Sequence, residues 1–595
     1  MTNTSIDARK DVYISDLYAF SLEKAHISPY TAKNKWEVMS YETAETKGKM
    51  LIASGESTPA PITIKPSLEG WYRIYICMGE VAGLPNHIDV KLTDDEFPRT
   101  VTPCRMGTYC MWNTSENVEE SFWKCADMTG QDITVSKPIF DAKYCANVFW
   151  FHFVPMSDEE VEAFKARKPH RHMIAHMDGD FHALDAKNSA HDFCKPIYTM
   201  KDSDVSIICQ EVINDLCTWE YPGEDYVYRD AISASRAKYF HTLTSNRGEI
   251  YKEQIAYAHQ HGIKMFAGHR MQLSNFSFPY DGPLFRIPFV DAHKHERCEA
   301  RDGTVIDFLS YGYEAVQNFI LDAMMESAKQ GFDGVLNIWT RGIHLYFEKP
   351  VADRFKEKFG DKIDMRTLKE DDPRLIEVKS DIIVEFYRKV RNAFSAFAKE
   401  NGKEEMKIYI TGCFDVQSSL NDGIDIARLA KEGLIDGVIQ TKMKLCEQTD
   451  DVLTEDGAAI DLARYTEKAR RERMYDRVSG SFMNLLAEGT KAYREIMDKY
   501  GIDYYTEIQW ETYKKPEEYV NGAKQVYSTY GCGISLWDCY PNRTNILSEW
   551  ESVSHLGDRE YVLNMSEDPR DYHKICKVLS YNGVDVRYIS PSWRG

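Results

Sequence analysis

The 595-residue sequence lacks several features that would place it in a membrane or on nucleic acid. It has no run of about 18 apolar residues, so we predict no transmembrane helix. Residues 1–18 contain no apolar signal-peptide region, which predicts a cytoplasmic protein. Basic residues are not in excess either, and the net charge is −20. Such a surface repels nucleic acid and anionic membranes, so we expect neither as a partner.

Several chemical motifs are missing as well. None of the 14 cysteines forms a CxxC pair, a distribution that predicts buried free thiols in a reducing compartment. The sequence has no P-loop and no GxGxxG opening a βαβ unit, so nucleotide binding is not expected. It also has no GxSxG elbow, which argues against a serine hydrolase of the α/β type. We therefore expect no cofactor.

What the sequence does contain is a repeated pattern, in which an amphipathic helical run ends on a glycine and a short apolar run follows. Glycine is favoured just past a helix C-terminus, and the apolar run is typical of a buried strand. The six glycines are Gly262, Gly331, Gly402, Gly433, Gly501 and Gly531. Two further apolar runs precede them. The eight units predict a (β/α)8 TIM barrel with strands near residues 174, 207, 265, 336, 409, 438, 506 and 535, in that order.

The pattern changes at both ends of the chain. Residues 1–155 contain short β-rich runs separated by turn residues, which predicts an antiparallel β-sandwich as an accessory domain. Ser157 and Glu160 have the spacing of a capping box, so we expect a helix there and place the barrel at 156–555. Residues 556–595 contain strand-like runs, including 558–567. We expect a C-terminal β extension that packs on the barrel or the sandwich.

Several segments resemble bacterial glycosyl-hydrolase-like (family 10 glycosylhydrolase-like) TIM-barrel proteins with an N-terminal β-sandwich. They are KPHRHMIAHMDGD, HQHGIKMFAGHRM, DGTVIDFLSYGYEAVQNFI, GFDGVLNIWTRGIHLYFEKP, ESFWKCADMTGQD and the tail GVDVRYISPS. The likeness covers most of the chain. It implies a carbohydrate-active enzyme on an α/β barrel, and it does not assign an acid or a base.

Hydrolysis of a glycosidic bond needs two carboxyl groups flanking that bond. Glu507 ends the seventh predicted strand and is the first candidate, because strand ends at the C-terminal face carry the chemistry of such barrels. Its alternative role is a structural ion pair inside the barrel. Glu348 follows the fourth strand, where it could instead pair with Arg341, and Asp178 follows the first. These three are the predicted catalytic residues.

Further polar and aromatic residues near the strand ends are predicted to bind the substrate through hydrogen bonds or stacking. They are His176, Glu211, His269, Arg270, Asn337, Trp339, Arg341, Gln509, Trp537 and Asp538. A zinc site would need three or four ligands, for which His176, Asp178 and Asp538 are candidates. The fifth and sixth strand ends offer no histidine, so we predict no metal.

Together these features predict a bacterial, cytoplasmic glycoside hydrolase that acts on a small oligosaccharide or glycoside. One alternative is a metal-dependent, amidohydrolase-like hydrolase using His176 and Asp178. Another is a non-catalytic carbohydrate-binding protein on the same fold. The sandwich is expected to buttress the barrel, shape its pocket or mediate homo-oligomers.

Overall fold

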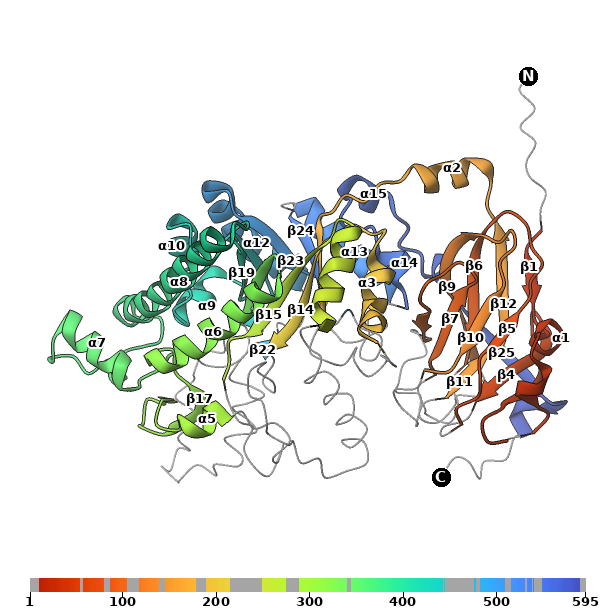
Figure 1. Cartoon of the computed structure of the whole chain (residues 1–595), viewed down its shortest axis with the longest axis horizontal. Coiled ribbons are helices and arrows are strands. Elements are labelled where there is room, and N and C mark those ends of the chain that lie inside the picture. Colours follow the sequence, from red (N-terminus) through yellow and green to blue (C-terminus); the bar gives the residue numbers. More distant parts are fainter. Residues whose placement is uncertain are drawn as a thin grey trace, which may run out of the picture.

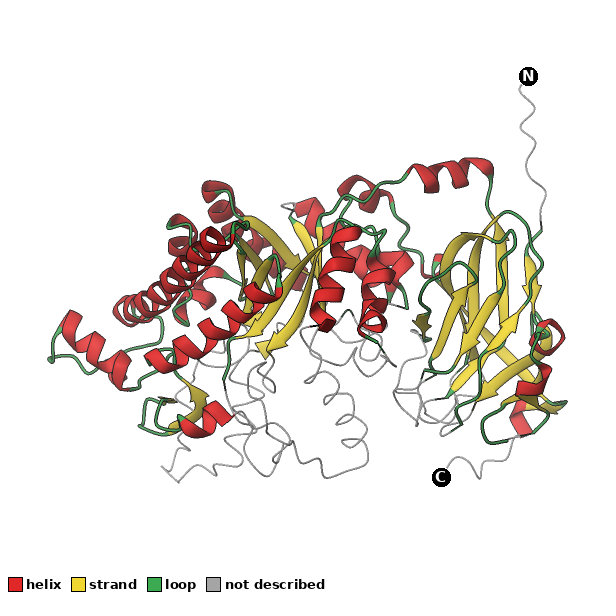
Figure 2. Cartoon of the chain, in the orientation of Figure 1, coloured by secondary structure: helices red, strands yellow, loops and turns green. Residues whose placement is uncertain are grey.

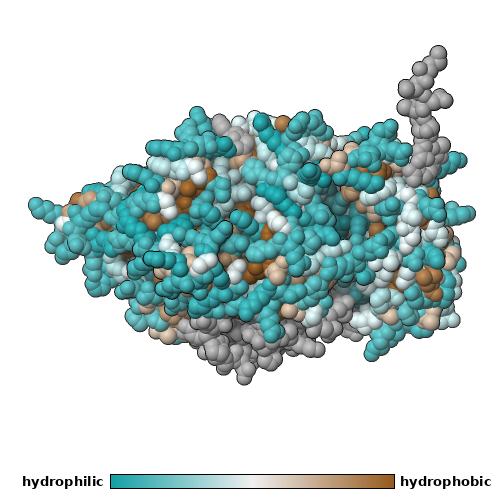
Figure 3. Space-filling view, turned by 45° about the horizontal axis from the view of Figure 1, so that its top comes forward, coloured by the Kyte–Doolittle hydropathy of each residue, from teal (hydrophilic) through white to brown (hydrophobic). Residues whose placement is uncertain are grey.

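The computed structural model places a β-rich domain beside an α/β barrel (Figures 1 and 2). It describes residues 10–30, 32–53, 57–79, 86–103, 117–138, 145–177, 189–213, 249–273, 288–339, 344–441, 443–444, 476–477, 482–508, 515–529, 532–537, 539 and 548–588. No helix within these ranges is long and apolar enough to cross a membrane. On the face shown in Figure 3, hydrophilic residues dominate and hydrophobic ones appear singly or in small groups.

The β-rich domain consists of two sheets of mainly antiparallel strands. The larger sheet has the order β1 (Val12–Ile14), β12 (Trp150–Pro155), β6 (Trp71–Met78), β9 (Asn117–Asp127), β25 (His573–Tyr581), β3 (Trp36–Thr43), β4 (Lys47–Ala53) and β11 (Ala146–Val148). The smaller has the order β5 (Ile62–Ile64), β10 (Ile133–Ser136), β7 (Ile88–Leu92) and β8 (Arg99–Val101). Alternate side chains of both sheets, such as Ile74, Phe151, Ile62 and Val90, form one buried core. Burial of these inner faces is what holds the two sheets together.

The larger sheet is completed by the far end of the sequence. Strand β25 lies between β9 and β3, antiparallel to both, and turns at Asn582 and Gly583 into the short β26 (Val584–Asp585). Both turn residues have positive φ, as a two-residue hairpin turn requires. The run from 558 to 567 is not a strand, contrary to the sequence prediction. It contains helix α15 (Arg559–Asn564), because the Asp558 side chain accepts a hydrogen bond from Tyr561 N and caps a helix there.

Helix α2 (Asp158–Ala166) leads from the β-rich domain to the barrel. Its predicted capping box is confirmed, because Ser157 Oγ accepts from Glu160 N and the Glu160 carboxylate accepts from Ser157 N. The two domains also touch directly, since helix α14 (Trp550–Val553) packs beside β9.

The closed eight-stranded parallel barrel is confirmed in the predicted order. Its strands are β13 (Met173–Met177), β14 (Val205–Ile213), β15 (Lys264–Arg270), β18 (Gly334–Ile338), β19 (Lys407–Gly412), β20 (Gly437–Gln440), β23 (Asp503–Glu507) and β24 (Gly533–Leu536). Strand β24 pairs with β13 and closes the barrel. The predicted helix-ending glycines have positive φ at Gly262, Gly331, Gly402, Gly433 and Gly501, while Gly531 lies outside the described residues.

Helices surround the barrel (Figure 2). The longer ones are α6 (Glu314–Gln330), α7 (Lys349–Phe359), α8 (Pro373–Asn401), α12 (Phe482–Tyr500) and α13 (Pro516–Thr529). Shorter ones include α3 (Lys195–Met200), α9 (Val416–Asn421) and α10 (Ile426–Lys431), and a further helix covers 249–260. On α6, Val316, Ile320 and Met324 are buried in the core that the helices form against the outside of the barrel. Two antiparallel strands, β16 (Arg297–Glu299) and β17 (Val305–Leu309), lie in the long connection before α6.

A separate apolar cluster fills the inside of the barrel. It contains Ile174, Ile207, Cys209, Phe266, Leu336, Ile338, Tyr409, Ile439 and Tyr505, with Trp537 packed against it. Glycines on the barrel strands make room for its rings. A Cβ at Gly437 would lie 2.6 Å from the Tyr409 ring, and one at Gly533 would lie 2.3 Å from the Tyr505 ring. The barrel is therefore a packed core, and its polar chemistry is displaced toward the strand ends.

Candidate active site

The strand alternation determines which side chains enter the barrel. Successive residues of a strand point to opposite faces, so residues two positions beyond the apolar interior cluster also point inward. At the C-terminal strand ends these are His176 after Ile174, Glu211 after Cys209, Arg270 after Phe266 and Gly268, Thr411 after Tyr409, and Glu507 after Tyr505. The barrel thus gathers polar side chains from five strands at its C-terminal end. Four of the five are predicted site residues.

Three of these residues form a connected polar array. Arg270 Nε lies 3.1 Å from both carboxylate oxygens of Glu211, and Glu211 Oε1 lies 3.4 Å from His176 Nε2. All three residues are buried. The hydrogen-bonded contact between the buried guanidinium of Arg270 and the carboxylate of Glu211 fixes the orientation of both side chains.

An aromatic ring lies against this array. Trp537 directly follows β24, and its ring centroid is 3.8 Å from that of His176 with an angle of 50° between the planes. Trp537 is only partly buried, in contrast to His176. A partly exposed indole beside fixed polar groups provides a surface on which a sugar ring can stack.

Glu507 is the last residue of β23 and is 6% exposed. In the barrel register it pairs with Ser535 of β24, the strand that leads to Trp537. Two carboxylates, Glu211 and Glu507, therefore face the interior at the same end of the barrel, with β13 and β24 between their strands.

Three predicted substrate-binding residues lie on the outside of the barrel. His269 Nε2 is 3.1 Å from Ser327 Oγ on α6, and burial lowers the pKa of His269 to about 3. Asn337 Nδ2 and Trp339 Nε1 both donate to the Tyr387 hydroxyl on α8, at 3.1 and 2.6 Å. These three side chains therefore contact the helices around the barrel and do not face the interior with the polar array.

Glu348 lies at the N-terminal boundary of α7 and is buried. Its carboxylate accepts hydrogen bonds from Tyr346 N at 3.0 Å, from Glu299 N at 3.3 Å and from the Ser310 hydroxyl. Burial raises the pKa of Glu348, while these hydrogen bonds act against that rise. The side chain thus joins the connection after β18 to β16.

Four predicted site residues lie outside the described part of the chain: Asp178, Arg341, Gln509 and Asp538. Thr411 is an inward-facing residue that is not among the predicted site residues, and its hydroxyl accepts a hydrogen bond from Trp339 N at 2.8 Å. The signal for it was available, since Thr411 is two residues after the aromatic Tyr409 on one strand.

No protein-family model matches this sequence, and no curated protein sequence matches it either. Solved structures with a similar fold include the glycoside hydrolase domain of PgaB (BpsB) from Bordetella bronchiseptica. It is 13% identical with a TM-score of 0.40, and the match covers 65% of this chain and 99% of that one. The glycoside hydrolase domain of PelA from Pseudomonas aeruginosa is 9% identical with a TM-score of 0.29, over 62% and 95% of the two chains.

The α-galactosidase TtGalA from Thermus thermophilus is 9% identical with a TM-score of 0.31, over 88% of this chain and 95% of that one. With TM-scores below 0.5, these similarities assign neither a substrate nor a catalytic residue to this chain.

Proposed function

We propose that this protein is a glycoside hydrolase that cleaves a glycosidic bond of a small oligosaccharide or glycoside at the C-terminal end of its barrel. One observation carries the proposal. Glu211 and Glu507 face the barrel interior at the ends of β14 and β23, and the partly exposed indole of Trp537 follows the strand between β23 and β13. Glycoside hydrolysis needs two reacting carboxyl groups. We assign one of them to Glu507, and Glu211 and Trp537 lie at the same end of the barrel, where they can bind and orient a sugar.

The two carboxylates suit different tasks. Glu211 is held in place by its contacts with Arg270 and His176, which suits a binding and orienting role. It fits hydrogen bonding to sugar hydroxyls, or electrostatic stabilisation of positive charge that develops on the sugar ring. Glu507 ends β23 at the same end of the barrel, and we assign it the role of acid, base or nucleophile.

The second reacting carboxyl group is assigned to Asp178, which follows the inward-facing His176 by two residues in the sequence. Glu348 is its competitor. Because Glu348 is enclosed by backbone donors, its removal should affect stability more than turnover.

A panel of aryl glycosides differing in sugar and anomeric configuration tests the proposal. Release of the aryl group is expected for at least one member, with activity unchanged after dialysis against a chelator. Loss of activity on chelation while the protein stays folded, restored by added metal, would favour the metal-dependent hydrolase. Binding of sugars without any turnover would favour the non-catalytic carbohydrate-binding protein.

A further inference from the structure

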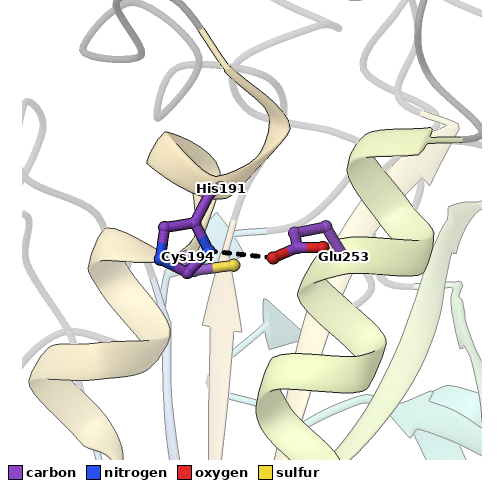
Figure 4. A group of neighbouring side chains, drawn as sticks. All are labelled: His191, Cys194 and Glu253. Atoms are coloured by element: carbon purple, nitrogen blue, oxygen red, sulfur yellow. Dashed lines mark hydrogen bonds and ion pairs between the residues drawn. The ribbon is translucent and has the colours of Figure 1, made fainter.

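Away from the strand ends, a histidine and a cysteine lie one turn apart where the barrel meets the β-rich domain. They are His191 and Cys194, the second and the last residue of the 3-10 helix Ala190–Cys194. In a 3-10 helix, residues i and i+3 project from the same face. Glu253, on the helix 249–260, completes a group of three (Figure 4).

The three side chains converge on a common point. His191 Nδ1 is 2.8 Å from Glu253 Oε1, and the Cys194 Sγ points toward the same space in Figure 4. One nitrogen, sulfur or oxygen ligand atom from each residue lies within 4.8 Å of the other two. Cys194 is buried, whereas the side chains of His191 and Glu253 are 45% and 43% exposed. The group therefore has a sulfur ligand inside and an open side through which an ion can enter.

We propose that His191, Cys194 and Glu253 bind a divalent transition-metal ion of the zinc type. Imidazole nitrogen, thiolate sulfur and carboxylate oxygen are the ligands that Zn²⁺ takes, at about 2.0–2.3 Å. Binding releases the Cys194 thiol proton to solvent, and one thiolate plus one carboxylate neutralise the charge of the ion. Water fills the fourth position on the exposed side. The site is structural, since it joins the connection after β13 to the helix after β14.

A carboxylate of the other domain supports this assignment. Glu96, which follows β7, lies with Oε1 2.7 Å from His191 Nε2, and its Oε2 accepts from the Tyr257 hydroxyl at 2.7 Å. A histidine that binds a metal through one ring nitrogen usually donates its other N–H to a carboxylate. Glu96 is therefore a positioning residue, and it connects the metal site to the β-rich domain.

The competing explanation is an ion pair of His191 with two glutamates and no metal. Such an exposed ion pair contributes only about 0–1 kcal/mol to the free energy of unfolding, and it does not involve Cys194. The cysteine therefore distinguishes the two explanations.

The test uses the full chain, stripped of metal by a chelator under reducing conditions and titrated with Co²⁺ and then Zn²⁺. We expect one Co²⁺ per chain with a sulfur-to-cobalt charge-transfer band, displacement by one equivalent of Zn²⁺, and a higher thermal unfolding midpoint. The Cys194→Ser variant should lose the band, and Glu96→Gln should keep it with about 10- to 100-fold weaker binding.

The matched control is His259→Gln. His259 is also 45% exposed and also pairs with a carboxylate, Asp333 at 2.8 Å, and it should bind as the unchanged chain does. If the Cys194→Ser variant does not fold, Glu253→Gln, at an exposed side chain, provides the same test, because it should bind Co²⁺ more weakly than the unchanged chain. Absence of a thiolate band in the unchanged chain, or unaltered binding in folded Cys194→Ser or Glu253→Gln, would overturn the proposal.

Discussion

A buried histidine on β25 of the β-rich domain contacts carboxylates of both domains, and it makes the free energy of unfolding depend on pH. His573 of β25 has no exposed side-chain surface. Its Nδ1 lies 3.2 Å from Glu119 of β9 and its Nε2 lies 3.3 Å from Glu517 of α13, with Glu549 also nearby. Burial acts to lower the pKa of His573, but the hydrogen bonds to the two glutamates outweigh it and raise this pKa to about 9.

The sign and size of the effect follow from linkage. The folded pKa is above the unfolded value of about 6.5, so folding favours the protonated ring. The contribution of protonated His573 to the free energy of unfolding is fully present below about pH 6.5 and is lost as the pH rises through about 9. A rise in the pKa from about 6.5 to about 9, at about 1.36 kcal/mol for each unit of pH, gives at most about 3–4 kcal/mol. We therefore expect the free energy of unfolding to fall over that window.

The assay is urea unfolding at several pH values between 6 and 9.5, on the unchanged chain and on His573→Gln. The difference in stability between them should be largest near pH 6 and should shrink toward zero above pH 9. His295→Gln is the control, because that side chain is 76% exposed and the substitution should change nothing. A flat profile for the unchanged chain, or an equally steep fall in His573→Gln, would refute the reasoning.

Three other substitutions test the barrel interior. Glu211→Gln should lower the free energy of unfolding by about 3 kcal/mol in urea, because it removes the counter-charge of buried Arg270. If the double variant with Arg270→Gln recovers none of this loss, the loss of the Glu211–Arg270 ion pair is not its cause. Gly437→Ala should cost about 1–3 kcal/mol by the same assay, since its Cβ would meet the Tyr409 ring, and wild-type stability would contradict that packing. Trp537→Ala should raise KM by up to about 10-fold with little change in unfolding, and an unchanged KM would remove its stacking role.

The positions of the barrel strands could be predicted from the sequence because the signal is local. A glycine such as Gly331 ends a helix through its own φ, and the buried strand follows within a few residues. The pairing of β25 between β9 and β3 is different, because it joins residues more than 450 positions apart and no local pattern encodes it.

The side on which each candidate residue lies was less predictable. His269 and Arg270 are neighbours on one strand, so only one of them can face the interior, and the alternation alone does not say which. The structure settles this through Phe266, which belongs to the interior cluster and shares its face with Arg270. Asn337 and Trp339 flank the inward-facing Ile338 and are directed to the helices by the same rule.

In the proposed function, the carboxylate of Glu507 at the end of β23 takes part in glycoside hydrolysis. The most direct measurement is kcat for Glu507→Gln on a glycoside that the unchanged chain hydrolyses, together with its urea unfolding curve. Gln keeps the size of the side chain and removes the titrating carboxylate. We expect kcat to fall at least about 100-fold while the free energy of unfolding is unchanged. Turnover near that of the unchanged chain, or a loss of stability in step with activity, would contradict it.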